Sequence, residues 1–111
     1  MLSESATAVM VRNEVWRGEV VTEPYEAGWA HEAVIFVTAM KNADGEAGTA
    51  HVEISPDGMR WAREGTSFEL PLGENRVAFA RVRHFGNWLR LAVEMPEGSE
   101  LRALVTIHAK A

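Results

Sequence analysis

The sequence predicts an all-β fold: an antiparallel two-sheet β-sandwich, jelly-roll-like, with about seven to nine strands. Apolar and polar residues alternate with period two along most of the chain, which is the pattern of half-buried strands. Turn residues interrupt this alternation roughly every eight to twelve residues, a spacing typical of sandwiches and barrels. The 111 residues suffice for a single domain, in which residues 1–5 are expected to form a flexible arm.

Six segments carry the strand pattern, in the order 15–22, 33–39, 48–55, 76–83, 88–94 and 100–109. The segment 33–39 is apolar at both parities, as expected for a strand in the middle of the core. The other five alternate, so one face of each strand packs inward and the other meets water or a partner. Leu89, Leu91 and Val93 show the alternation most clearly.

Turn chemistry separates these strands. Ser55-Pro56-Asp57-Gly58 places Pro where φ near about −65° is needed and Gly where φ becomes positive, which predicts a type I turn with a glycine bulge. Residues 42–45 and 96–98 repeat this logic, and together the three turns predict antiparallel hairpins. Further connections are expected at 71–75 and 85–87. Residues 25–33, the only helix candidate, contain a glycine and lack a firm cap, which favours a long loop.

The apolar residues expected to face inward form the predicted core: Val20, Ile35, Val37, Val52, Ile54, Trp61, Phe79, Leu89, Leu91, Val93, Val105 and Ile107. Trp61 is expected to pack over the turn 55–58. Apolar and aromatic residues occupy both faces of several strands, and they include Trp16, Phe36, Trp88 and Leu104, which are expected to point outward. Because a two-sheet sandwich has only one inner layer, this apolar surplus needs a covering surface.

Composition narrows the classes of function and location. The net charge is −5 and the basic residues are dispersed, which argues against a nucleic-acid partner. The chain contains no cysteine, which removes disulfides and thiolate metal sites. No signal peptide or apolar run long enough to span a bilayer is visible, so we expect no membrane partner and a cytoplasmic or virion-associated protein.

The first candidate site is the irregular segment 23–32, which gathers Tyr25, Trp29 and His31 beside three carboxylates. Aromatic rings present a large area at low entropic cost, so this loop could form a platform for a sugar or a partner chain. Alternatively, Tyr25 and Trp29 fold back and plug one end of the sandwich. Both interpretations remain open at the level of the sequence.

The second candidate site surrounds the predicted turn 85–87. If this turn is a hairpin, Arg83, His84 and Arg90 share one face and could bind an anion or a carboxylate. Trp88 lies beside them as a further candidate contact. Alternatively, Arg81 and Arg90 form ordinary cross-strand ion pairs with Glu53, Glu64 or Glu94.

Catalytic and metal-binding patterns are lacking in the sequence. The four histidines show no spacing typical of metal ligands. No nucleophile elbow, phosphate loop or dinucleotide fingerprint is present. We therefore expect no catalytic residues, no metal and no cofactor, and predict that the protein is not an enzyme.

Two stretches resemble known families. Residues 51–61, HVEISPDGMRW, are similar to a hairpin with an S-x-D-G turn found in discoidin-type binding domains and in many phage-associated β-sandwiches. Residues 79–91, FARVRHFGNWLRL, resemble the arginine-bearing strand that follows it, and look like short proteins of phage structural genes. The chain is shorter than a discoidin domain and lacks its bridging cysteines and spike loops. No binding residue is therefore carried over.

The apolar surplus and the phage-type resemblance lead to one functional hypothesis. The protein is expected to be a structural or assembly subunit that self-associates, or that decorates a larger particle such as a phage virion, with protein as its partner. The alternative is a carbohydrate- or ligand-binding module that uses Tyr25, Trp29 and Trp88 as stacking platforms.

Overall fold

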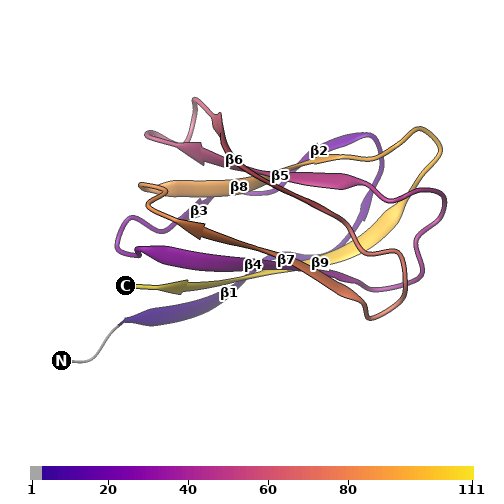
Figure 1. Ribbon diagram of the computed structural model, residues 1–111, viewed down its shortest axis with the longest axis horizontal. Coiled ribbons are helices and arrows are strands. Elements are labelled where there is room, and N and C mark those ends of the chain that lie inside the picture. The colour runs from indigo at the N-terminus through magenta and orange to yellow at the C-terminus, as the bar shows by residue number, and fades with distance from the viewer. Residues whose placement is uncertain (1–3) are drawn as a thin grey trace.

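The computed structural model describes residues 4–111 and confirms the two-sheet antiparallel sandwich (Figure 1). Its strands are β1 (Ser5–Trp16), β2 (Glu19–Val21), β3 (Tyr25–Glu26), β4 (Glu32–Ala39), β5 (Thr49–Ser55), β6 (Ala62–Glu69), β7 (Val77–Arg83), β8 (Trp88–Glu94) and β9 (Leu101–Lys110). The four-stranded sheet has the order β1-β9-β4-β7, and the five-stranded sheet the order β2-β8-β5-β6, with β3 also paired to β8.

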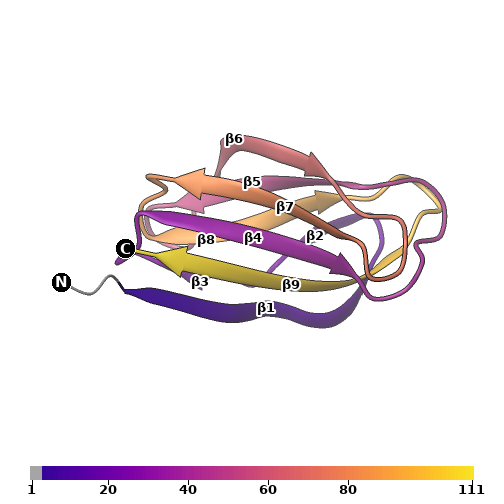
Figure 2. The same cartoon turned by 60° about the horizontal axis from the view of Figure 1, so that its bottom comes forward.

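The order of strands is that of a jelly roll. Strands β2 and β3 lie along the same neighbour, β8, and act as one interrupted edge strand. With that pair counted once, the chain crosses to the other sheet at every connection except the one between β5 and β6. Figure 2 shows the four-stranded sheet from its outer side, with β1 next to β9. The predicted jelly-roll class is therefore confirmed at the level of topology.

Inward-facing aliphatic side chains hold the two sheets together. Ile35 of β4 lies opposite Ile107 of β9 and Ala80 of β7, and all three are buried. Val52 and Leu91 form the equivalent inward pair of the five-stranded sheet. Of the predicted core, eight residues are fully buried: Ile35, Val37, Val52, Leu89, Leu91, Val93, Val105 and Ile107. Val20 and Ile54 are partly buried and pack against this core.

Three aromatic residues lie elsewhere than predicted. Phe79, placed in the core from the sequence, is 46% exposed on the outer face of the four-stranded sheet. Trp61 is only half-buried. Trp16, predicted to face outward, is 1% exposed and belongs to the core. Its strand ends at Trp16 itself, and Gly18, with a positive φ of 60°, lies in the turn that takes the chain into the other sheet. The predicted single strand 15–22 is thus two strands in different sheets.

The N-terminal segment and the segment after the first hairpin contain strands that the sequence did not predict. Strand β1 begins at Ser5, which pairs with Lys110, so Ser5 is not part of a free arm. Residues 1–3 of the predicted arm lie outside the described residues. Strand β6 extends the hairpin that begins at β5. Within residues 4–111, no helix is long and apolar enough to cross a membrane.

Only one of the predicted hairpins joins neighbouring strands of one sheet. The turn 55–58 connects β5 to β6, which are paired. The turns 42–45 and 96–98 each connect strands of different sheets, so the hairpin prediction is wrong at these two positions. The connection 85–87 also crosses between sheets. Turn residues reverse the chain in either case, and they carry no information about which sheet receives the next strand.

The different burial of Trp16 and Trp61 yields a test. We expect Trp16→Ala to lower the free energy of unfolding by about 3–5 kcal/mol, because it leaves a large cavity in the core. Trp61→Ala should cost only about 1 kcal/mol, the scale of its contact with an arginine. Urea unfolding followed by circular dichroism measures both. Equal losses in the two variants would contradict the assigned burial.

Candidate functional site

The outer face of the four-stranded sheet carries a continuous row of apolar side chains. The residues facing outward from its strands β4, β7 and β9 include Val34, Phe36, Thr38, Val77, Phe79, Leu104 and Thr106. Val77 and Phe79 are 53% and 46% exposed, and Val9 of β1 extends the row with 45%. We call this set the apolar row. It is larger than the isolated exposed apolar residues that are normal on soluble proteins.

Aromatic contacts organise the end of the apolar row on β4 and the edge strand β7. The ring centroids of Phe36 and Phe79, which face each other across β4 and β7, are 6.0 Å apart with an interplanar angle of 41°. The His108 ring meets Phe36 edge-on at 5.2 Å. The Cζ atom of Arg81 lies 5.1 Å from the centre of the Phe79 ring. These contacts hold the rings in place while leaving Phe79 open to solvent.

A hollow of about 530 Å³ adjoins the apolar row at the end of the sheet where β4 begins. Its lining includes the apolar side chains of Val34 and Phe36, the ring of His108, and three cationic side chains: Arg81, Arg83 and Lys110. Glu32 is the acidic residue of the lining and accepts a hydrogen bond from Arg83 at 3.4 Å. The hollow therefore combines apolar surface with positive charge.

The outer face of the five-stranded sheet is built differently, around ion pairs. The Nε atom of Arg90 donates to the Glu53 carboxylate at 2.8 Å, and both side chains are mostly buried. The Cζ atom of Arg90 also lies 4.2 Å from the centre of the Trp61 ring. The cross-strand ion pair predicted for Arg90 is thus present, and the same guanidinium covers one face of Trp61.

Trp88 packs over the turn 55–58, in the position that the sequence assigned to Trp61. A Cβ atom added at Gly58, where φ is 78°, would lie 3.3 Å from the Trp88 ring. Ser55 lies directly opposite Trp88 across β5 and β8. Gly58 therefore serves both the positive φ of the turn and the close approach of the indole.

The second candidate site of the sequence analysis is divided between two faces. Arg83 lies on β7 and points away from the four-stranded sheet, whereas Trp88 and Arg90 point away from the five-stranded sheet. His84 lies in the connection between them with φ of 52°. The predicted common face of Arg83, His84 and Arg90 is therefore wrong, because residues 85–87 cross between sheets instead of forming a hairpin.

The first candidate site is also divided. Tyr25 is half-buried and packs against the core, so it behaves as the predicted plug. Trp29 remains 37% exposed in the loop before β4. His31 is exposed, and its backbone is anchored by an N–H donated to the carbonyl of Lys110 at 2.8 Å. The loop thus offers Trp29 and His31 to solvent without Tyr25.

No cluster of metal ligands is present in the described part of the chain, because no group of three His, Cys, Asp or Glu side chains among residues 4–111 is placed to hold an ion. The prediction that no metal is needed stays a prediction. The same holds for the expected absence of cofactors and of catalytic residues.

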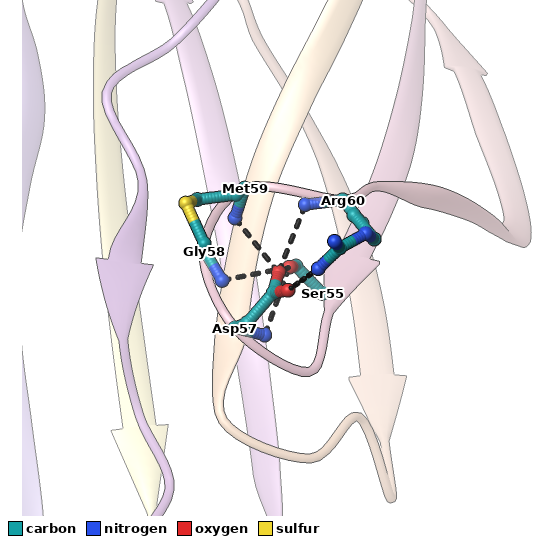
Figure 3. A network of polar contacts seen from close by, with 5 residues as sticks. All are labelled: Ser55, Asp57, Gly58, Met59 and Arg60. Carbon is teal, nitrogen blue, oxygen red and sulfur yellow. Dashed lines mark hydrogen bonds and ion pairs between the residues drawn. The ribbon is translucent and has the colours of Figure 1, made fainter.

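The S-x-D-G turn is a closed hydrogen-bond network (Figure 3). The Asp57 carboxylate accepts the backbone N–H groups of Met59 and Arg60, both at 2.9 Å, and the Arg60 guanidinium at 2.7 Å. The Ser55 hydroxyl oxygen accepts the N–H of Gly58 at 2.8 Å. The backbone N–H of Arg60, followed by that of Met59, lowers the pKa of Asp57 to about 2. The turn explains Asp57 without a catalytic role.

The sequence already indicated that Phe79 faces outward with the apolar row. Its placement in the predicted core overlooked this indication. Val77, Phe79, Arg81 and Arg83 share one parity of β7, so the side that places the arginines in water also exposes Phe79. Arg63 likewise indicates that Trp61 faces outward, because the two residues are two positions apart just after the turn and therefore share one side of the strand.

Comparisons with known proteins support the fold. No protein-family model matches the chain, and no curated protein matches its sequence. The structure is similar to the crystal structure of the SPBc2 prophage-derived protein YomS, with a TM-score of 0.65 over 100% of this chain and 96% of that chain. The sequence identity is 8%, so the likeness shows the fold alone. The resemblance to a phage protein is supported to that extent, and the discoidin-type resemblance is not confirmed.

The network around Asp57 predicts a specific titration. Because the folded-state pKa is lowered from 3.8 to about 2, the contribution of this carboxylate to stability is present above about pH 4 and is lost as the pH falls towards 2. Titration of the Asp57 carboxyl by NMR measures it directly. Arg60→Ala removes only the side-chain bond, so its Asp57 should still titrate well below 3.8. A value of 3.8 in the wild type would contradict the network.

Proposed function

We propose that this protein is a non-catalytic assembly subunit of a phage-type particle, and that it self-associates through the outer face of its four-stranded sheet. The observation that carries the proposal is the apolar row, in which Phe79 stays 46% exposed although it contacts the Phe36 ring and the Arg81 guanidinium. An exposed aromatic residue that is already ordered before binding is a favourable anchor for a protein interface, because little conformational entropy is lost on binding.

Part of the apolar surplus predicted from the sequence is present in the structure and supports this proposal. Trp16 is buried and Trp88 packs over Gly58 on the other sheet, so neither counts towards it, whereas Phe36 and Leu104 are half-buried on the outer face of the four-stranded sheet. Val77 and Phe79 add to that face. The similarity in fold to a prophage-derived protein agrees with a phage-type role.

A second candidate function is a carbohydrate- or ligand-binding module, which the exposure of Trp29 favours. Its predicted partners do not join it, since Tyr25 packs against the core and Trp88 packs over Gly58. Quenching of tryptophan fluorescence by simple sugars, lost in Trp29→Ala, would support this candidate. Unchanged fluorescence would leave assembly as the better proposal.

The assembly proposal predicts different effects of two matched substitutions. Phe79→Ser should weaken self-association at least about tenfold, a loss of about 1.4 kcal/mol, because it removes the anchor. Leu72→Ser is the control, since Leu72 is also 46% exposed but lies in the loop between β6 and β7. It should leave association unchanged.

Sedimentation velocity over a range of protein concentrations measures both variants, with circular dichroism to verify folding. A wild-type protein that stays strictly monomeric at tens of micromolar would contradict the proposal. Equal weakening by the two substitutions would show that the interface lies elsewhere.

A further inference from the structure

The two outer faces of the sandwich carry opposite charge. Four cationic side chains point outward from β4, β7 and β9, against one carboxylate, that of Glu32: the cations are Arg81, Arg83, Arg102 and Lys110. From the five-stranded sheet, two arginines, Arg63 and Arg90, point outward against five carboxylates: Glu19, Glu26, Glu53, Glu69 and Glu94. We call the two surfaces the basic face and the acidic face.

Internal ion pairs reinforce the imbalance on the acidic face. Arg63 donates to Glu94 at 2.8 Å and Arg90 donates to Glu53 at 2.8 Å, so both arginines are already engaged. Glu19, Glu26 and Glu69 form no ion pair within residues 4–111. These three carboxylates are available to an outside partner.

The basic face shows the opposite situation. Glu32, the one carboxylate that points outward from its strands β4, β7 and β9, pairs with Arg83 at 3.4 Å. Arg81 lies over Phe79, and neither Arg102 nor Lys110 forms an ion pair within the described part of the chain. The uncompensated cations surround the apolar row that we propose as the contact surface.

This charge distribution selects between two geometries of self-association. A symmetric contact between two basic faces would bring like charges together around the apolar row, which disfavours it. A contact between the basic face of one copy and the acidic face of another brings opposite charges together. The acidic face also supplies apolar contacts, because Val21 is 55% exposed there beside a second hollow of about 220 Å³ lined by Val21, Ala92 and Glu19.

We propose that a second copy of this chain docks its acidic face on the basic face, so that copies stack head to tail; this inference rests on the proposed assembly function. The two faces lie on opposite sides of the sandwich (Figure 1). A bound copy therefore leaves one face of each kind free, and the contact continues as an open stack or closes as a ring instead of ending at a dimer.

Charge reversal on each face tests the geometry. Arg81→Glu and Glu19→Lys should each weaken self-association about tenfold, because each brings like charges together in the stack. An equimolar mixture of the two variants should recover most of the wild-type association, since each altered face then meets an altered partner face. Lys41→Glu and Glu97→Lys, in exposed loops off both faces, make the same changes in net charge and should have no effect.

Sedimentation velocity at about 50 and about 500 mM salt completes the test, since screening should weaken the wild-type contact at least about fivefold. Association that needs Phe79 but is strengthened by Arg81→Glu and unaffected by Glu19→Lys would overturn the head-to-tail geometry and leave the assembly function standing. Weakening by Arg81→Glu alone would also overturn it, because the basic face would then bind something other than the acidic face. A monomeric wild type would overturn both proposals.

Discussion

The alternation of side chains along a β-strand is the constraint on which the structure depends. Once Ile35, Ile107 and Val52 face the interior, every residue at the opposite parity of those strands must face outward. The same rule that builds the core therefore exposes Phe79 and Arg81 together on β7. The residues of the outer faces are therefore determined by the same register that buries the core.

Connectivity is the second constraint, and it separates residues that are close in sequence. Arg83 and Arg90 are divided by one tight turn, yet they lie on opposite outer faces because the chain changes sheets between β7 and β8. Residues far apart in sequence meet instead, as when Ser5 pairs with Lys110. Any site on this fold is therefore assembled from strands that are neighbours in the sheet, and seldom from neighbours in the chain.

Sequence reasoning predicted the fold class, the all-β content and most of the core, because these depend on local periodicity. Leu89, Leu91 and Val93 show how closely period-two alternation follows burial. It could not predict that the turns 85–87 and 96–98 cross between sheets, since the same turn chemistry serves both kinds of connection. The second candidate site failed for this reason, whereas the first was divided because Tyr25 packs against the core. Trp16 was misplaced although it has the same parity as Val20, which packs against the core, so the parity itself indicated an inward position.

The edges of the sheets explain why faces are the surfaces left for association. A free strand edge can recruit another strand, but each edge here is protected. Strand β1 has register shifts after Val9 and Val11, and β6 has one opposite residues 51–53. The other edge of the five-stranded sheet, beside β8, consists of the short strands β2 and β3, which are separated by a gap. On β7, Arg81 and Arg83 place charge along the edge. Strand addition is disfavoured at all four edges, so the apolar and charged surface of the faces remains for contacts between molecules.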